Sequence, residues 1–356
     1  MAFTFPIDAQ ELIDERAAQW ISQGVQPGVV QQVRGRITNM WLDGPGGWAH
    51  EWSAAATQAE QDSDPLSAAL LYGVAKFPVL ADDSHRRAYD NQLRTYLAAA
   101  EHLPVAFERH SVDVPFRASS VPVATHLYQP TDLPDDAPLV LALSGVDTWK
   151  VELHRTAVGA AQAVRARIAT VDMAGTGESL VPNGPDGELY LVGVIDWLRK
   201  RFPASRKVGA IGFSFGGHWT TKLALTRRVD AAVSIGGLVE AAFSAENVTA
   251  LRFGMAGIFG NSLRLDVAPS PAQLVETMAS FSLRTQGLLD NWGADPIPLL
   301  SVNGDLDQHV PTADTTVLED RPNTIARLVP GASHCAAERL GDLMPWILDW
   351  LRAELS

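Results

Sequence analysis

A short glycine-rich segment places a serine between glycines at the point where a strand pattern gives way to a helix pattern. Residues 212–217, Gly-Phe-Ser-Phe-Gly-Gly, follow the apolar run 208–211 and lead into the helical pattern of 217–226. This is the G-x-S-x-G arrangement of a nucleophile elbow, whose glycines allow a sharp turn that exposes the serine. A plain glycine-rich turn would look similar, but the strand-then-helix setting favours Ser214 as a nucleophile.

Partners for such a serine follow later in the chain. A serine hydroxyl needs a histidine to remove its proton, and the histidine needs a carboxylate to fix its tautomer. Asp307 follows an apolar strand pattern and His334 follows the next one, so the order is Ser, Asp, His, as in α/β-hydrolases. We prefer Asp307 as the acid because its spacing from Gly304 and the Val-Pro after it fit the usual loop. Asp305 is the alternative, and either aspartate could instead cap a turn.

Acyl transfer to a serine also requires an oxyanion hole made by two backbone N–H groups. One is expected from Phe215, the residue after the nucleophile, and the second from the loop 144–150, where Gly145 permits close approach of the backbone. We choose the N–H of Val146 as that second donor, although the loop could also be an ordinary strand-to-helix turn. Trp149 in this loop and His218 after the elbow are candidate substrate-pocket residues, and His218 suits a structural role equally well. The proposed chemistry needs no metal and no cofactor.

Short strand patterns and helix patterns alternate through residues 105–356, which places these groups on one sheet. Two patterns typical of antiparallel edge strands come first, and continuous apolar runs typical of buried parallel strands follow. The alternation predicts an α/β-hydrolase fold, a mostly parallel sheet with helices on both faces. The expected strands are 106–114, 121–128, 139–143, 168–172, 208–213, 231–235, 297–303 and 325–329.

The first 104 residues show a different texture, with apolar residues at three- and four-residue spacing and no alternating runs. We expect residues 1–104 to form an N-terminal helical cap domain and 105–356 to form the catalytic domain. Trp41, Trp48 and Trp52 in the helical part either pack between helices or wall an aromatic substrate pocket.

Residues 238–292 lie between the expected strands 231–235 and 297–303 and are far longer than a normal connection. Their composition is helical rather than disordered, and an insertion at this point would lie over the carboxyl edge of the sheet, where ligands bind in open α/β folds. We therefore expect a helical lid insertion or pocket wall.

The composition of the chain limits the kinds of molecule that it can be expected to bind. The chain has 356 residues, a formal charge of −13 and one cysteine, so a basic nucleic-acid-binding face and an intrachain disulfide are both excluded. Residues 1–20 lack the pattern of a secretory signal, and no apolar run has the length of a membrane span. These observations predict a cytoplasmic enzyme acting on a small molecule, without nucleic-acid or membrane partners.

The chain resembles the FrsA-like group of α/β-hydrolases over nearly its whole length. The resemblance depends on four segments: Ser-Gly-Val-Asp-Thr-Trp-Lys-Val-Glu at 144–152, Asp-Met-Ala-Gly-Thr-Gly-Glu-Ser at 172–179, the elbow at 212–217, and Tyr-Gly-Val-Ala-Lys-Phe-Pro at 72–78. The segment 172–179 is superficially similar to a phosphate-binding loop, but it fits a structural turn better. Ser144 stands where the family usually has glycine.

The resemblance implies a helical domain that closes the pocket, a homodimer, and hydrolysis of a carbon–carbon bond next to a ketone, or of an ester, in an aromatic or polyketide-like substrate. It gives the same triad of Ser214, Asp307 and His334, and it suggests a pocket glutamate after the sixth strand, to which either Glu240 or Glu246 would correspond. A carboxylesterase or thioesterase acting on a small acyl substrate would need the same triad. A binding protein on a hydrolase scaffold is the alternative of another class.

Overall fold

The computed structural model describes residues 2–290, 292–293 and 295–356, which form two compact units. The N-terminal unit combines Met1–Leu103 with Arg252–Pro269, and the sheet unit combines Pro104–Leu251 with Ser270–Ser356. The expected insertion at 238–292 is therefore divided, since its middle part groups with the N-terminal helices rather than with the catalytic domain. Met1 in the expected cap and Asn291 in the expected insertion lie outside the described residues.

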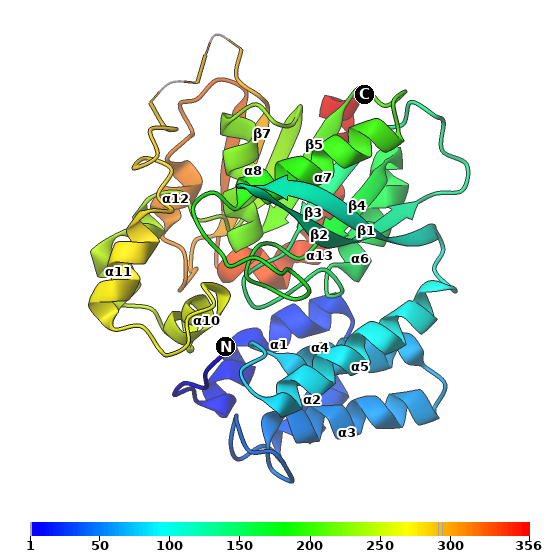
Figure 1. The fold of residues 1–356 in the computed structure, drawn as a ribbon, viewed down its shortest axis with the longest axis vertical. Coiled ribbons are helices and arrows are strands. Elements are labelled where there is room, and N and C mark those ends of the chain that lie inside the picture. The colour runs from blue at the N-terminus through cyan, green and yellow to red at the C-terminus, as the bar shows by residue number, and fades with distance from the viewer. Residues whose placement is uncertain (1, 291, 294) are drawn as a thin grey trace. The chain divides into compact units, whose positions relative to one another are not determined.

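The sheet unit is built on an eight-stranded sheet with the strand order β1-β2-β4-β3-β5-β6-β7-β8 (Figure 1). The pairs β1–β2 and β2–β4 are antiparallel, and all other pairs are parallel. This confirms the predicted mostly parallel sheet with an antiparallel edge. The strands are β1 (Ala106–Phe116), β2 (Ser119–Gln129), β3 (Leu139–Leu143), β4 (Arg167–Val171), β5 (Val208–Phe213), β6 (Ala231–Ile235), β7 (Leu299–Gly304) and β8 (Thr324–Val329).

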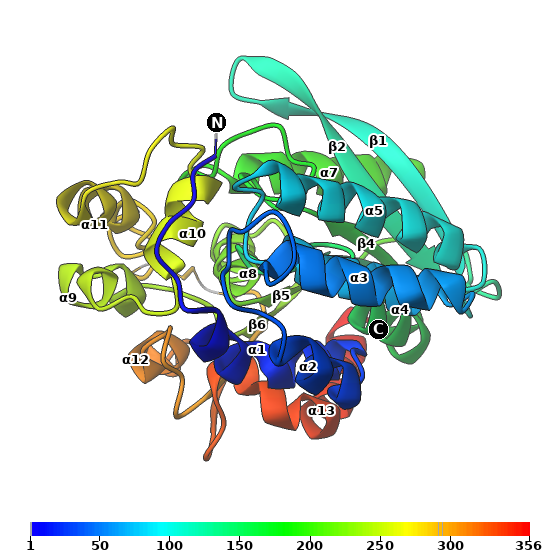
Figure 2. The ribbon, with the colours of Figure 1, turned by 90° about the horizontal axis from the view of Figure 1, so that it is seen from below.

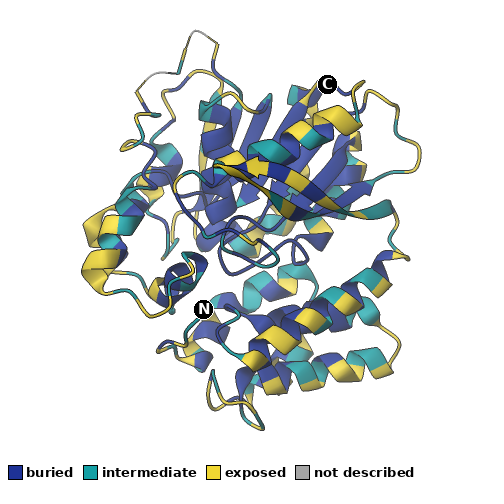
Figure 3. Ribbon diagram, in the orientation of Figure 1, coloured by how far each residue is buried: buried dark blue, intermediate teal, exposed yellow. Residues whose placement is uncertain are grey.

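Helices cover both faces of this sheet, because its central strands are apolar on both sides. Every residue of β3, β4 and β6 is buried, which is typical of parallel strands with helices above and below (Figure 3). Helices α7 (Glu188–Arg201) and α8 (Phe215–Leu225) pack together on one face. Helix α13 (Leu340–Leu355) packs with the π-helical turn η1 (Ala161–Arg165), and α6 (His154–Ala160) contacts β4.

The remaining helices of the sheet unit are short and lie in its connections. Helix α12 (Thr312–Thr316) separates β7 from β8, and the 3-10 turn η3 (His334–Arg339) leads into α13. After β6 come the turn η2 (Ala241–Phe243), α9 (Ala245–Thr249) and α11 (Pro271–Ala279), which begins with a capping box between Ser270 and Gln273. The predicted helical character of this segment is thus present as short helices.

The N-terminal unit consists of helices, as its apolar spacing predicts. Helices α3, α4 and α5 lie side by side (Figure 2), and aspartates at positions 8, 64 and 82 cap the N-termini of α1, α4 and α5. The helices are α1 (Ala9–Gln23), α2 (Pro27–Arg34), α3 (Trp48–Gln61), α4 (Pro65–Lys76), α5 (Asp83–Ala100) and, from the later segment, α10 (Met255–Ser262).

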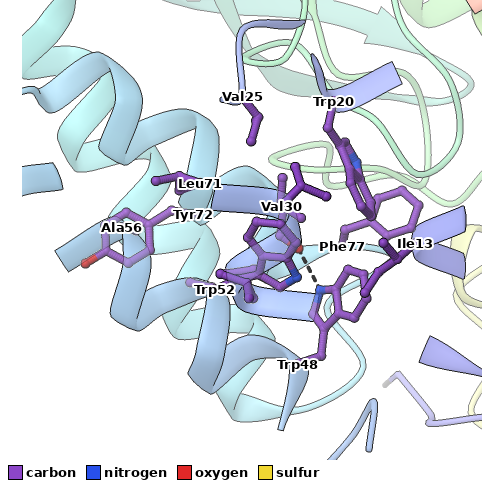
Figure 4. Close-up of a cluster of buried hydrophobic side chains, with 14 of the residues drawn as sticks. Ile13, Trp20, Val25, Val30, Trp48, Trp52, Ala56, Leu71, Tyr72 and Phe77 are labelled. Carbon is purple, nitrogen blue, oxygen red and sulfur yellow. Dashed lines mark hydrogen bonds between the residues drawn. The ribbon is translucent and has the colours of Figure 1, made fainter. Parts of the chain in front are cut away.

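Tryptophans form the centre of this helical unit (Figure 4). Trp48 and Trp52 are fully buried, and both rings pack at 5.7 Å from the ring of Trp20. The indole N–H of Trp48 donates to the Val74 carbonyl at 2.7 Å. Trp48 and Trp52 are therefore core residues rather than the walls of a substrate pocket, which was the other interpretation of the sequence. Trp41 is half-buried, and its indole N–H donates to the Phe5 carbonyl at 2.7 Å.

Two glycines explain why α10 groups with the N-terminal segment. A methyl group on Gly257 would lie 2.2 Å from the Phe5 ring, and one on Gly260 would lie 2.8 Å from the Phe3 ring. Asn261 also exchanges two hydrogen bonds with the backbone of Phe3, at 3.1 and 3.0 Å. The close approach that glycine permits thus ties the later helix to the start of the chain.

Within the described part of the chain, no helix combines the length and the apolar character that crossing a membrane requires.

Candidate active site

Ser214 occupies a strained turn between β5 and α8. Its backbone has φ 54° and ψ −122°, a region that residues other than glycine rarely adopt. The turn is possible only because the residues two positions before and after Ser214 are glycines, since a methyl group on Gly212 would lie 2.2 Å from the Gly216 carbonyl oxygen. The Ser214 N–H donates to the Ile235 carbonyl at 2.8 Å, which fixes the turn against the end of β6. This is the geometry expected of a nucleophile elbow.

The loop after β3 lies directly against this serine. A methyl group on Gly145 would lie 3.5 Å from Ser214 Oγ, and one on Gly216 would lie 2.5 Å from the Ser144 carbonyl oxygen. The backbone of residues 144 and 145 thus lies close to the elbow, and a side chain at Gly216 would not fit between them. This is the place where the second oxyanion donor, the N–H of Val146, is expected.

The predicted acid and base form a hydrogen-bonded pair. His334 Nδ1 lies 2.7 Å from Asp307 Oδ2, and the two side chains are 9% and 0% exposed. The imidazole lies beside the elbow, because a methyl group on Gly236 would be 3.1 Å from His334 Cε1 and the preceding residue, Ile235, accepts the Ser214 N–H. The structure therefore brings Ser214, Asp307 and His334 to the same end of the sheet.

Electrostatics polarise this pair. Burial lowers the pKa of His334, but the Asp307 carboxylate outweighs burial and raises that pKa well above 6.5. Burial raises the pKa of Asp307, but His334 and the hydrogen bonds from Asn303 and the His309 N–H bring it down to about 2. Asp307 is therefore ionised at neutral pH and stabilises the imidazolium that forms when His334 accepts a proton.

A buried amide, not anticipated from the sequence, holds the acid in place. Asn303, at the end of β7, donates from Nδ2 to Asp307 Oδ2 at 2.7 Å. Its Oδ1 accepts the N–H of Gly304 at 2.9 Å and that of Cys335 at 3.0 Å. Asn303 thus joins the acid loop to the histidine loop. The only signal in the sequence is a polar residue near the end of a mostly apolar strand.

Trp149 supports, from within, the loop 144–150, which we call the oxyanion loop because the second oxyanion donor is expected there. It is 4% exposed, its N–H is bonded to Glu152 Oε2 at 2.9 Å, and its indole N–H donates to the Val146 carbonyl at 3.2 Å. The indole therefore fixes the backbone at Val146, whose own N–H is the expected oxyanion donor. Its ring is mainly a buttress of that loop.

A buried ion-pair network anchors the end of the same loop, and no individual role for its members was predicted from the sequence. Lys150 is fully buried, and both its N–H and its ammonium bind Asp172, the residue that follows β4. The ammonium also lies 2.7 Å from Glu178 Oε2, and Glu178 lies 2.6 Å from Arg109. The turn 172–179 is thus a structural partner of the oxyanion loop. This agrees with the interpretation of this segment as a structural turn rather than a phosphate-binding loop.

The remaining candidates take structural or peripheral positions. His218 is fully buried among aromatic rings, and burial lowers its pKa to about 3. Because a carbonyl oxygen can only accept, His218 Nδ1 donates to the Leu238 carbonyl at 3.0 Å. Glu240 is 33% exposed and lies 2.5 Å from Arg284, whereas Glu246 on α9 is exposed. The Asp305 carboxylate accepts the Gly331 N–H at 2.7 Å, which separates its role from that of Asp307.

His309 lies closer to the site than the sequence indicates. Its ring packs edge-on against that of His334, with centroids 5.1 Å apart, and its N–H donates to Asp307 Oδ1 at 2.7 Å. Among the residues that the structure describes, no three histidine, cysteine or acidic side chains gather in a way that could hold a metal ion.

A serine elbow after a central parallel strand, with an acid after β7 and a histidine after β8, defines the α/β-hydrolase class. The chain belongs to the FrsA-like esterase family, whose model, described as Esterase FrsA-like, matches residues 14–324. The chain is therefore a hydrolytic enzyme. Esterase FrsA of Vibrio vulnificus strain YJ016 is 27% identical over 330 residues, covering 82% of this chain and 76% of the relative. Esterase FrsA of Vibrio cholerae strain O395 is 28% identical over 327 residues, with the same coverage.

Two solved structures share the fold over almost the whole chain. The structure titled AbyA5 wild type has a TM-score of 0.78 at 19% identity, covering 97% of this chain and 95% of the other. The structure titled 2,6-dihydroxy-pseudo-oxynicotine hydrolase has a TM-score of 0.75 at 22% identity and covers 95% of both chains. At these identities the likeness concerns the fold.

Proposed function

We propose that this enzyme is a serine hydrolase that cleaves acyl compounds with Ser214 as nucleophile, His334 as general base and Asp307 as the acid that orients the histidine. The observation that supports this most strongly is the hydrogen-bonded His334–Asp307 pair beside a serine in strained elbow geometry. Activation of a serine hydroxyl needs this arrangement.

The steps follow from the arrangement. Ser214 Oγ attacks the substrate carbonyl while its proton passes to His334 Nε2, and the oxyanion that forms accepts hydrogen bonds from the N–H groups of Phe215 and Val146. When the tetrahedral intermediate collapses, His334 returns the proton to the leaving group and an acyl-enzyme remains. Water, deprotonated by His334, then attacks the acyl-enzyme, and the proton returns to Ser214 as the acid leaves.

Ester hydrolysis is the reaction that we propose first, because the matching family and its curated relatives are named esterases. An alkoxide or phenolate leaving group needs only the proton that His334 supplies. The test is hydrolysis of p-nitrophenyl acetate and butyrate by the purified enzyme, with Ser214→Ala as control. Saturable hydrolysis that is lost in the variant supports the proposal, and equal rates in the two proteins contradict it.

Hydrolysis of a carbon–carbon bond next to a ketone is the second candidate. It is favoured by the fold shared, along the whole chain, with the protein titled 2,6-dihydroxy-pseudo-oxynicotine hydrolase. The leaving carbanion must be stabilised as an enolate or phenol, which restricts substrates to β-diketones and acyl phenols. Assaying such a panel beside the esters, by the loss of the substrate's ultraviolet absorbance, separates the two reactions.

Pairing of two copies and a cytoplasmic location also belong to this proposal, on the basis of the family resemblance and the lone cysteine at position 335. Sedimentation equilibrium of the purified protein tests the pairing, with a mass of two chains expected.

A further inference from the structure

The segment that follows β6, residues 236–243, passes directly beside the candidate active site. We call it the β6 turn. A methyl group on Gly236 would lie 3.1 Å from the His334 ring, and one on Gly237 would lie 2.8 Å from the Gly217 backbone. At its far end the Phe243 ring packs 6.3 Å from the ring of Phe215, the expected oxyanion residue. The turn thus borders the imidazole of the candidate base at one end and packs against the buried ring of the residue after the candidate nucleophile at the other.

One buried carboxylate holds most of this turn. Asp314, on α12, is 2% exposed and accepts four successive backbone N–H groups: those of Val239 at 3.0 Å, Glu240 at 3.0 Å, Ala241 at 2.6 Å and Ala242 at 3.0 Å. Hydrogen bonds to an ionised acceptor are stronger than neutral ones, and four donors leave little of the carboxylate unsatisfied. Each of these amides would otherwise be a buried or half-buried donor in an irregular turn.

A second anchor reaches the turn from the elbow helix. His218, on α8, donates from Nδ1 to the Leu238 carbonyl at 3.0 Å, and its ring packs 5.3 Å from that of Phe243. Asp314 belongs to the connection that also contains Asp307, whereas His218 belongs to the helix that begins after Ser214. The β6 turn is therefore held on one side by the connection that contains Asp307 and on the other by the helix that follows Ser214.

We propose that Asp314 is a positioning residue that fixes the β6 turn as a rigid wall of the acyl pocket and thereby sets selectivity for acyl-chain length. The selectivity part depends on the proposed function, whereas the anchoring part does not. Because movement of residues 239–242 would leave a buried carboxylate without its donors, this part of the insertion acts as a wall and not as a lid.

The anchor is tested by hydrogen–deuterium exchange, because the four amides bonded to Asp314 report on it directly. In Asp314→Asn, which keeps the shape of the side chain but replaces one acceptor oxygen with an NH₂ group, exchange across 239–242 should accelerate by roughly tenfold or more. Peptides from α8 should exchange as in the wild type. The control Asp320→Asn changes an exposed aspartate of the same connection and should leave exchange unchanged.

Unchanged exchange across 239–242 in Asp314→Asn would overturn the anchor. Accelerated exchange throughout the sheet unit would also contradict it, since the effect would then be general unfolding. If Asp314→Asn does not fold, Asp314→Glu keeps the charge but displaces it by one methylene group. The same local acceleration is then expected, and its absence would overturn the proposal.

Selectivity is tested with p-nitrophenyl acetate and octanoate. In Asp314→Asn the ratio of kcat/KM for the two esters should change by about tenfold, mainly through KM. One methylene group in a hydrophobic pocket changes kcat/KM by roughly tenfold or more. The rate of Ser214 labelling by a small fluorophosphonate should stay within about threefold of wild type. Equal losses for both esters and for labelling would overturn the positioning role.

Failure of the proposed function would look different. Wild-type protein that neither hydrolyses the esters nor reacts with the fluorophosphonate would contradict the serine mechanism and the selectivity role with it. The exchange experiment would still decide whether Asp314 anchors the β6 turn.

Discussion

The two loops that flank Ser214 are held in place by different kinds of contact. On the β3 side, the oxyanion loop ends at Lys150, whose buried ammonium binds Asp172 and Glu178. On the β7 side, Asp307 and His334 are joined by the neutral amide of Asn303 and by backbone N–H groups. In the proposed mechanism only the second side changes charge, when His334 takes up a proton.

This difference indicates a division of labour. A compensated buried ion pair fixes a backbone firmly but tolerates the loss of neither partner. Neutral hydrogen bonds orient the acid without adding a charge that would compete with the imidazolium for it. Changes on the two sides should therefore fail in different ways, the β7 side in catalysis and the β3 side in folding stability.

The largest effect on catalysis is expected from Asp307→Asn. The amide would hold His334 in the wrong tautomer, and kcat for an ester substrate should fall by about 10³- to 10⁴-fold with little loss of stability. Steady-state kinetics and thermal unfolding measure the two quantities. Asp305→Asn, two residues away and hydrogen-bonded to Gly331, is the matched control and should cost less than about tenfold. Similar losses in both variants would mean that the acid is misassigned.

Lys150→Met should act on stability first. It leaves the buried Asp172 carboxylate without its cation and the half-buried Glu178 with Arg109 alone, so the free energy of unfolding should fall by about 3–5 kcal/mol. Chemical denaturation measures this change. Lys207→Met, at an exposed position before β5, should change it by less than about 0.5 kcal/mol. A Lys150 variant as stable as wild type would remove the contrast between the two sides.

Asn303→Ala should affect both stability and catalysis, each less than the variant that changes it most. It removes one hydrogen bond to Asp307 and leaves the N–H groups of Gly304 and Cys335 without their acceptor, at a cost of about 1–3 kcal/mol for each buried group left unpaired. Because the bond from Asn303 helps to lower the pKa of Asp307, that pKa should rise. We expect kcat to fall less than in Asp307→Asn, and a larger fall would contradict this account.

The smallest expected effect is on the pH dependence of kcat/KM, which should also differ between changes on the β7 side and changes on the β3 side. His334 accepts a proton only when neutral, and Asp307 raises its pKa well above 6.5. The kcat/KM of an ester should therefore increase with pH along a limb whose midpoint lies above 6.5. In Asp307→Asn the largest of the causes that raise the pKa of His334 is gone, so the residual activity should rise at lower pH. Lys150→Met should leave the midpoint in place.

The sequence predicted the fold well because its signals are local. Strand β3 is a continuous apolar run, β6 is apolar except for Ser234, and the elbow glycines stand two positions from the serine that they expose. The pairing of Asp307 with His334 followed from the order of residues in the chain. Catalytic roles for these residues stay predictions until they are measured.

Contacts between distant segments could not be predicted. Nothing near Asp314 in the chain shows that it binds residues about seventy positions earlier, and nothing near Gly257 indicates that Phe5 packs on it. Lys150 and Asp172 stand in recognisable motifs, but their ion pair depends on β3 and β4 being neighbours in the sheet. Trp48 and Trp52 were ambiguous because an aromatic residue at helical spacing suits a core and a pocket equally.

The most direct test of the central claim is labelling with a fluorophosphonate probe, followed by mapping of the modified peptide by mass spectrometry. Such probes react only with a serine whose hydroxyl is activated by a base. We predict one adduct, on Ser214, that is absent from Ser214→Ala and strongly slowed in His334→Ala. No adduct under conditions that label a control serine hydrolase, or an adduct on another residue, would contradict the account.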